Sequence, residues 1–271
     1  MAILEPFALA IAFLLSYIYD FIASYGFSIA ILTVVINVII FPLTLRQTRS
    51  TKRMQDAQSD IKALQKKHKD NKEELNKAMA AMYKEKGINP LGCILPLIVQ
   101  MPIWFALFRV LREPLSFIPG TSLLFKDLEN STSLTFFNMD LQIPPSEVSE
   151  WIERVPYLVL ILFVILTALY QQQQITKKSN NSNNPQAQQM QMIGKVMPIF
   201  FGFISWTLPT GLVVYFLTGN IFRIGQQALI VKLDDREETK KENTKNEENE
   251  QQNDNPVQEN PRKNRKKRRR K

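Results

Sequence analysis

The sequence predicts an all-α integral membrane protein with five transmembrane helices, an N-terminal interfacial helix and a cytoplasmic helical hairpin. Three observations support this fold class. Of the 271 residues 45% are hydrophobic, and long apolar runs alternate with strongly charged segments. Apolar runs of about 18 residues or more predict membrane-spanning helices. The Lys and Arg residues behind the net charge of +9 concentrate in alternate connecting segments, as in multi-span membrane proteins.

The membrane core is expected to cover residues 26–232, between an N-terminal segment of residues 1–25 and a tail of residues 233–271. Each expected span is an apolar run bounded by charged residues or by a turn. The five spans are Ser28–Leu45, Leu91–Leu111, Pro156–Gln173, Ile193–Leu208 and Gly211–Val231. Pro209 and Thr210 start a tight turn between the fourth and the fifth span.

Charge counts predict the orientation of these spans. Arg46–Pro90 carries 12 Lys and Arg against 6 Asp and Glu, Gln174–Lys195 carries 3 against none, and the tail from Lys232 carries 14 against 10. Arg112–Val155 carries 3 against 7. Basic loops stay in the cytoplasm. We therefore expect a multi-span protein of the cell membrane, with its N-terminus outside and its C-terminus in the cytoplasm.

The N-terminal segment contains a sixth apolar run, Pro6–Ser24. It contains Asp20, follows Glu5 and carries no basic residue. Without a basic region it does not resemble a secretory signal peptide. A spanning helix here would place an acidic end in the cytoplasm and leave almost no chain for a turn. We therefore expect an interfacial helix on the outer leaflet, with a sixth span as the alternative.

The charged segment 51–86 shows helical periodicity. Asp70, followed by Glu73, is typical of a helix N-cap with a capping box. We expect a hairpin of helices Thr51–His68 and Asn71–Lys86, each with a thin apolar stripe. The stripe residues are Met54, Ile61, Leu64, Leu75, Met79 and Met82. So thin a stripe buries little surface, which predicts a mobile hairpin. The alternative is a cytoplasmic loop that merely happens to be helical.

The tail is expected to be disordered from about Asp234, because it is rich in Glu, Lys, Asn and Gln and lacks apolar periodicity. The flexible loop expected at Gln171–Gln191 has a similar polar composition. The basic end of the tail consists of Arg262, Lys263, Arg265, Lys266, Lys267, Arg268, Arg269, Arg270 and Lys271. Such a block attracts polyanions, here ribosomal RNA or anionic lipid headgroups. A simple positive-inside anchor is the alternative.

Three polar residues are expected at one depth inside the membrane. Asn37 and Gln100 each lie nine residues from the expected cytoplasmic edge of their span, and Arg223 lies eight residues from its edge. At about 1.5 Å per residue, all three are about 12–14 Å deep. A charge at the bilayer centre costs about 2.5–3.5 kcal/mol on insertion scales. A chain that keeps polar groups at one depth therefore has a use for them.

Helical spacing also gathers polar residues into stripes. Phe216, Asn220, Arg223 and Gln227 share one face of the fifth span, and Thr33 and Asn37 share one face of the first. Two facing stripes would line a wet cavity in the inner half of the bilayer. The alternatives are interhelical hydrogen bonds for Asn37 and Gln100, and snorkelling to the headgroups for Arg223.

Several stretches carry a family resemblance. Phe41–Ser50 reads FPLTLRQTRS, and Asn89–Phe108 reads NPLGCILPLIVQMPIWFALF. Met197-Pro198, the Pro209–Gly211 turn, and Gly219–Phe222 followed by Gln226-Gln227 complete the set. In order and spacing, these stretches over about residues 20–232 resemble the YidC/Oxa/Alb family of membrane protein insertases. The short outer segment resembles the form without a large periplasmic domain.

The resemblance implies a groove that is open to the cytoplasm and to lipid and closed to the outside. It would receive hydrophilic parts of nascent membrane proteins, with the hairpin guarding its entrance. The ribosome, through the basic tail, and the Sec translocon are further candidate partners. Gln171 matches a groove-lining glutamine of the family, and Phe216 stands where the family often has Trp. The candidate groove therefore consists of Thr33, Asn37, Gln100, Gln171, Phe216, Asn220, Arg223 and Gln227.

One position departs from the family pattern. The family usually carries an arginine in the first span where this chain has Asn37, five residues before Pro42. A neutral amide cannot attract acidic residues of a client protein. We hypothesise that Arg223, at the same expected depth, supplies the missing charge from the fifth span.

Other classes of function fit the sequence less well. His68 and Cys93 are the only residues of their types and lie in different segments, and no acidic pair lies within a span. We therefore expect no catalytic residues, no metal, no cofactor and no small-molecule substrate. A small-solute or ion transporter or channel is the main alternative, although the chain shows no internal repeat and no ring of like charges. A passive ribosome tether is the third class.

Overall fold

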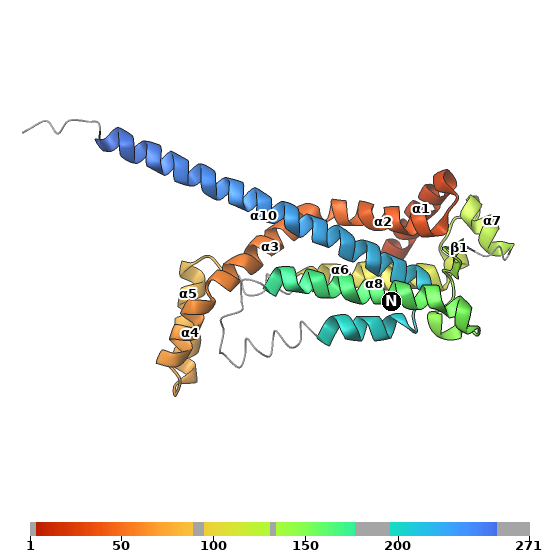
Figure 1. The fold of residues 1–271 in the computed structure, drawn as a ribbon, viewed down its shortest axis with the longest axis horizontal. Coiled ribbons are helices and arrows are strands. Elements are labelled where there is room, and N and C mark those ends of the chain that lie inside the picture. Colours follow the sequence, from red (N-terminus) through yellow and green to blue (C-terminus); the bar gives the residue numbers. More distant parts are fainter. Residues whose placement is uncertain (1–3, 89–94, 131–133, 177–195, 254–271) are drawn as a thin grey trace, which may run out of the picture. The chain divides into compact units, whose positions relative to one another are not determined.

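The computed structural model describes residues 4–88, 95–130, 134–176 and 196–253, and the fold is helical (Figure 1). The chain divides into two units, Met1–Gln226 and Gln227–Lys271. Its elements are α1 Glu5–Ile22, α2 Tyr25–Ile39, α3 Phe41–Asp56, α4 Gln58–Lys67, α5 Lys72–Glu85, α6 Leu95–Arg112, η3 Pro114–Ser116, α7 Leu123–Glu129, β1 Thr135–Phe136, β2 Met139–Asp140, η4 Pro145–Glu147, α8 Trp151–Thr176, the short helix Val196–Ser205 and α10 Thr210–Asn253.

Two of the described helices are long and apolar enough to cross a membrane, α1 and the Trp151–Gln174 part of α8. The bent pair α2 and α3 would add a third if it acts as one span. The first expected span, Ser28–Leu45, is thus broken rather than continuous, with an angle of 63° between its parts. Pro42 explains the break, because proline lacks an N–H and its ring clashes with the carbonyl one turn earlier.

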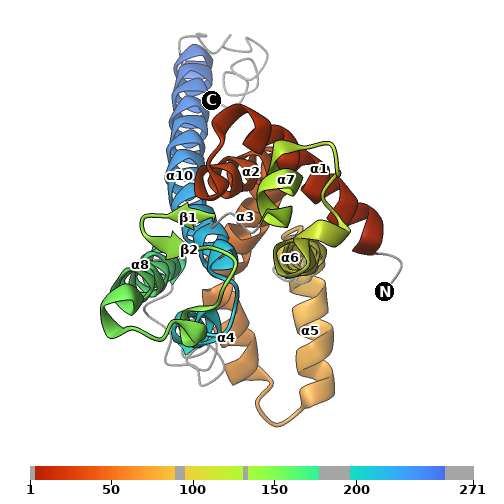
Figure 2. The ribbon, with the colours of Figure 1, turned by 90° about the vertical axis from the view of Figure 1, so that its right-hand side faces the viewer.

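Helix α1 lies across the bundle. Figure 2 shows α6 and α8 end-on and α1 lengthwise, so α1 crosses their direction. Near its C-terminal end, Tyr19 Oη donates to Asp127 Oδ2 at 2.8 Å, and Asp20 Oδ1 accepts from the Leu123 N–H at 3.0 Å. Leu123 is the first residue of α7, so Asp20 satisfies one of the unpaired amides at that helix start. Whether α1 spans the membrane or lies at its interface stays a prediction, since its length and hydropathy also suit a span.

Helices α4 and α5 pack against each other around a small apolar cluster. Ala57, Met82 and Ile88 are buried there, beside Met54, Ile61, Leu64 and Tyr83. The N-cap of α5 is Asn71 rather than the expected Asp70, since Asn71 Oδ1 accepts from the amides of Glu73 and Glu74 at 3.1 and 3.2 Å. An N-cap oxygen reaches the amides two and three residues ahead, so this bonding starts the helix one residue later.

The described residues between α6 and α8, 113–130 and 134–150, form a small cap on the core. The cap contains η3, α7, the antiparallel pair β1 and β2, and η4. Strand β1 lies close against the start of α2, where a Cβ added to Gly26 would lie 2.2 Å from Cγ of Phe136. The turn into α10 is fastened to the same cap, because the N–H and Oγ1 of Thr210 both donate to the Ile143 carbonyl, at 3.1 and 2.7 Å.

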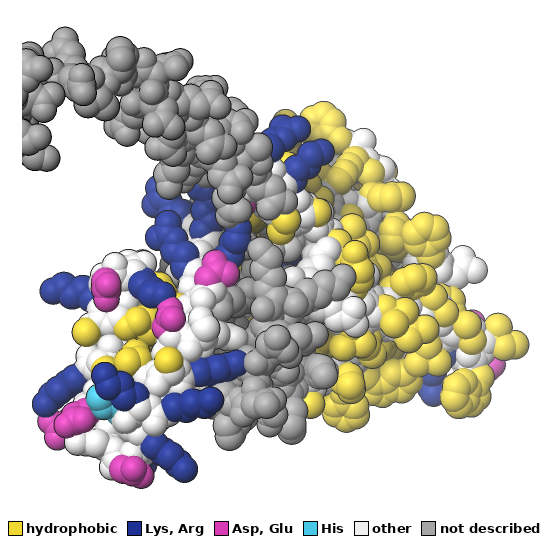
Figure 3. Space-filling view, turned by 60° about the vertical axis from the view of Figure 1, so that its left-hand side comes forward, with side chains coloured by type: hydrophobic (Ala, Val, Ile, Leu, Met, Phe, Trp, Pro, Cys, Tyr) yellow, Lys and Arg dark blue, Asp and Glu magenta, His cyan; other side chains and the backbone are white. Residues whose placement is uncertain are grey.

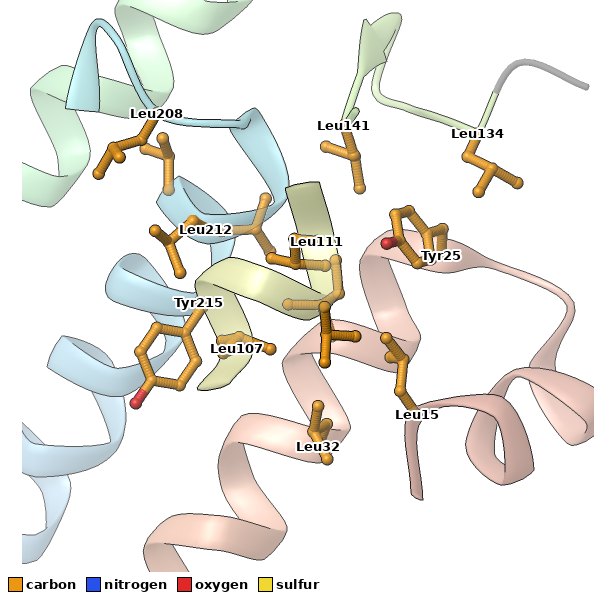
Figure 4. Close-up of a cluster of buried hydrophobic side chains, with 14 of the residues drawn as sticks. Leu15, Tyr25, Leu32, Leu107, Leu111, Leu134, Leu141, Leu208, Leu212 and Tyr215 are labelled. Carbon is orange, nitrogen blue, oxygen red and sulfur yellow. The ribbon is translucent and has the colours of Figure 1, made fainter. Parts of the chain in front are cut away.

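The hydrophobic core joins segments that lie far apart in the sequence. Figure 4 shows buried side chains from α1, α2, α6, α10 and the cap converging on one cluster. The most deeply buried of them have no exposed surface; they include Leu15, Leu32, Leu107, Leu141 and Leu212. Complete burial of leucines from so many elements accounts for the association of the helices through close packing.

Helix α10 differs from the sequence prediction at its C-terminal end. The expected span ended at Val231 and disorder began near Asp234, but the helix continues to Asn253. Residues 232–253 are rich in Glu, Lys and Gln, which have high intrinsic helix propensity and continue a helix without apolar contacts. The flexible loop expected at Gln171–Gln191 begins inside a helix, because α8 continues to Thr176. The rest of that segment and the basic end, 262–271, lie outside the described residues.

Candidate functional site

The candidate groove residues lie on four elements. Helix α2 carries Thr33 and Asn37, α6 carries Gln100, α8 carries Gln171, and α10 carries the remaining four. In this arrangement α10 supplies polar side chains toward two different neighbours. One set of contacts leads to α6 and the other to α8.

The contact between α10 and α6 centres on the charged residue. Arg223 Nη2 donates to Gln100 Oε1 at 2.9 Å. The other end of the same amide is also occupied, because Gln100 Nε2 donates to the hydroxyl of Tyr215. Tyr215 is buried, with 3% of its surface exposed, whereas Arg223 and Gln100 are both half-buried. The three side chains form a chain of two hydrogen bonds at the boundary of the packed core.

Arg223 has no acidic partner in the part of the chain that the structure describes. Its only described hydrogen bond is the one to the neutral amide of Gln100. A guanidinium carries five N–H donors in a planar fork that matches a carboxylate. The arginine is therefore held in place yet keeps donors for a further anionic group.

The contact between α10 and α8 is neutral. Asn220 Nδ2 lies 3.3 Å from both the Val164 carbonyl and Thr167 Oγ1. Thr167 in turn donates to the Phe163 carbonyl of its own helix at 2.7 Å. Hydrogen bonds of this kind join helices in membranes. Asn220 thus connects α10 to α8, whereas Arg223 connects α10 to α6.

The polar stripe of α2 is buried and bonded within its own helix. Thr33 Oγ1 donates to the Ile29 carbonyl at 2.6 Å, and Asn37 Nδ2 donates to the Thr33 carbonyl at 2.8 Å. Asn37 is only 4% exposed. The stripe does face α10, because a Cβ added to Gly219 would lie 3.9 Å from Thr33 Cγ2. Close packing, rather than a shared polar contact with Arg223, describes this part of the interface.

The other three candidate groove residues, Phe216, Gln171 and Gln227, have no described hydrogen bond to Arg223 or Gln100. Phe216 packs edge-on against Phe201, with 5.9 Å between ring centroids. Gln171 is half-buried on α8. Gln227 belongs to the second unit, so it is not placed relative to the others. The structure thus brings Gln100 and Arg223 into direct contact, and it places Asn37 and Asn220 against other partners.

Two residues of the site were not predicted from the sequence. The Tyr215 hydroxyl accepts a hydrogen bond from Gln100 Nε2, and Thr167 Oγ1 accepts one from Asn220 Nδ2. In the sequence, both residues are recognisable as hydroxyl-bearing side chains within an apolar run. Gln226 adds a further polar group, since its Nε2 is buried without a hydrogen-bond partner among the described residues. It lies one turn beyond Arg223 on α10.

Charge is segregated over the first unit. Figure 3 shows Lys and Arg side chains, with a few Asp and Glu, over the helices α3 to α5 on the left and a broad hydrophobic surface on the right. The sequences of these three helices are hydrophilic on average, in contrast to α2 and α6. A basic region beside an apolar band is the pattern expected of a cytoplasmic end next to the membrane.

Comparisons with known proteins give a consistent family. Residues 17–238 match the family model described as 60Kd inner membrane protein. The chain is 31% identical over 237 residues to the membrane protein insertase YidC of Treponema denticola and 30% identical over 223 residues to the inner membrane protein ALBINO3, chloroplastic, of Arabidopsis thaliana. These matches cover 84% and 78% of this chain. They cover only 38% and 47% of the relatives, so the chain spans less than half of their length.

A solved structure has a similar fold. It is described as an active YidC insertase crystal structure with the first transmembrane domain resolved. The TM-score is 0.52 at 24% sequence identity, over 79% of this chain and 43% of that chain. At this level of identity the similarity establishes the fold.

Proposed function

Because the chain belongs to the 60Kd inner membrane protein family, we propose that it is a membrane protein insertase of the YidC type. In this function it receives hydrophilic segments of nascent membrane proteins from the cytoplasm and lowers the cost of moving them across the bilayer. The clients are the nascent chains themselves, and no cofactor or small-molecule substrate takes part. Two observations support this proposal: the similarity to membrane protein insertases, and the hydrogen bonds of Arg223 and Gln100 beside the packed core.

The observation that carries the proposal is the Arg223 contact. An arginine without an acidic partner in the described chain stands on a helix of the membrane core, beside a glutamine of a second helix. A membrane-embedded charge without a counter-charge is costly and marks a functional site. A client carboxylate would be its natural counter-charge. This supports Arg223 as the residue that takes the role of the family's first-span arginine, here replaced by Asn37.

The same proposal includes five spans, an external N-terminus and a cytoplasmic C-terminus in a bacterial membrane. The charge counts of the connecting segments and the basic surface over α3 to α5 support this orientation. Helices α4 and α5 would then lie in the cytoplasm beside the groove entrance. Their apolar cluster is small, which supports a mobile gate. The ribosome, through residues 262–271, and the Sec translocon remain proposed partners.

We expect the purified protein in liposomes to insert a purified single-span substrate in the absence of ribosomes. Protection of the translocated tail from added protease measures insertion, and release of a trapped ion or dye measures leakage. Insertion without flux is the expected result, because a groove closed to the outside conducts nothing. Flux without insertion would favour a transporter or channel, and failure without ribosomes would favour a passive tether.

A further inference from the structure

Two residues of α10 engage the two ends of the Gln100 amide. Its Oε1 accepts from Arg223 and its Nε2 donates to Tyr215. An amide has two such ends, and each is matched here to a partner of the correct polarity. Because a guanidinium only donates, Arg223 fixes which end of the amide faces it, and the tyrosine hydroxyl, which can donate or accept, anchors the other end. If the amide turned over, its N–H donors would face a cation.

Tyr215 is itself held firmly. Its ring belongs to the buried cluster in Figure 4, beside Leu212 and Leu107, and its hydroxyl points away from the leucines. The hydroxyl therefore cannot move without disturbing the core. Tyr215 and Arg223 lie about two turns apart on α10. Long helical side chains lean toward the N-terminus, which brings the guanidinium back toward the level of Tyr215.

We propose that Gln100, anchored by Tyr215, is a positioning residue that holds Arg223 with a neutral oxygen, and that a client carboxylate displaces this oxygen. This inference rests on the proposed insertase function. A carbonyl oxygen of an amide satisfies one guanidinium N–H without neutralising the charge. A carboxylate can bind the same fork with two charge-assisted hydrogen bonds, each roughly twice as strong as a neutral one. An acidic client segment therefore replaces Gln100 Oε1, and the amide takes its place again when the segment leaves.

The chemistry predicts selectivity for acidic segments that depends on the neutrality of residue 100. A carboxylate at this position would have the same size and reach as the amide. It would form a stable ion pair with Arg223, and the arginine could then no longer bind a client carboxylate. The loss would be confined to acidic clients, because a neutral segment does not need the guanidinium.

We expect Gln100→Glu to lower insertion of a single-span substrate with Asp in its translocated tail by about tenfold more than it lowers insertion of the same substrate with Asn in the tail. Gln100→Met removes both hydrogen bonds at similar length, so it should lower insertion of the Asp substrate by a smaller factor. Gln173→Glu is the matched control, because Gln173 is exposed on α8. Liposome insertion of both substrates measures each effect.

A purely structural role for Gln100 gives a different pattern. In that case Gln100→Glu and Gln100→Met would lower insertion of the Asp and Asn substrates alike, and the inference would be overturned. Unchanged insertion of the Asp substrate by Gln100→Glu would overturn it as well. The Arg223→Ala variant separates this failure from failure of the proposed function. If Arg223→Ala is defective while Gln100→Glu is not, the displacement mechanism alone is wrong.

Discussion

Arg223→Ala is expected to lower insertion of a substrate with an acidic translocated tail by about tenfold or more. A hydrogen bond to a charged group contributes about 1.5–3 kcal/mol, and each 1.4 kcal/mol corresponds to about a factor of ten. The arginine has no acidic partner among the described residues, so its removal leaves no buried carboxylate behind. The measured quantity is the initial rate of protease-protected tail formation in liposomes.

Two comparisons make this result specific. The same substrate with Asn in place of Asp should insert at nearly the wild-type rate, because it does not use the charge. Arg223→Lys should retain part of the activity, since an ammonium keeps the charge but lacks the planar fork. Equal insertion of the acidic substrate by Arg223→Ala and wild type would show that Arg223 does not replace the arginine missing at Asn37.

The second large effect concerns stability. Gly26→Ala is expected to destabilise the protein by about 1–3 kcal/mol, the usual cost of overpacking. The new Cβ would lie 2.2–2.7 Å from three atoms of the Phe136 ring, and strand β1 would have to move away from α2. The apparent melting temperature in detergent should fall by several degrees, since 1 kcal/mol corresponds to about 2–4 °C for a chain of this size.

Gly225 offers a matched control for this substitution. It lies in α10 with nothing within 4 Å of an added Cβ, so Gly225→Ala should be neutral or stabilise by up to about 1 kcal/mol. Combining Gly26→Ala with Phe136→Ala should cost less than the sum of the two single changes, because the second removes the clash. If Gly26→Ala and Gly225→Ala shift the melting temperature equally, the cap does not pack on α2 as described.

Much of the fold follows from local patterns. Apolar runs and charged edges predict where the helices lie, and counting residues from those edges gives Gln100 and Arg223 a common depth. The hydrogen bond of 2.9 Å joins these two residues. The sequence also indicates a break in the first span, because Pro42 lies within it. The 63° bend it accompanies depends on packing around α2 and α3, which no local pattern contains.

The choice of partners could not be predicted in the same way. Asn37 is expected at the same depth as Gln100 and Arg223, yet its amide donates to the Thr33 carbonyl of its own helix. Tyr215 lies about 80° around the helix from Arg223 by residue counting, so it falls outside the polar stripe. Its contact with Gln100 arises from side-chain length and from the helix opposite. Spacing along one helix predicts a face, whereas the partner of each side chain depends on how the helices are assembled.

Two features of the cap and the tail also could not be predicted from local sequence patterns. Asp20 looked unfavourable in an apolar helix, but it accepts a hydrogen bond from the start of α7, more than a hundred residues later in the chain. The region from Asp234 to Asn253 looked disordered because it lacks apolar periodicity, yet α10 continues through it. Long-range contacts explain the first difference and helix propensity explains the second.

Water accessibility of Arg223 and Gln100 tests the account most directly. In a Cys93→Ser background, Arg223→Cys and Gln100→Cys should react with a membrane-impermeant thiol reagent added from the cytoplasmic side and not with reagent added outside. Thr33→Cys is the matched control and should stay unreactive, because Thr33 of α2 is fully buried and packs beside Gly219 of α10. Labelling of the first two positions from the cytoplasm alone is the result that a hydrated, one-sided groove predicts. Protection of both positions from both sides, or labelling from the outside, would contradict it.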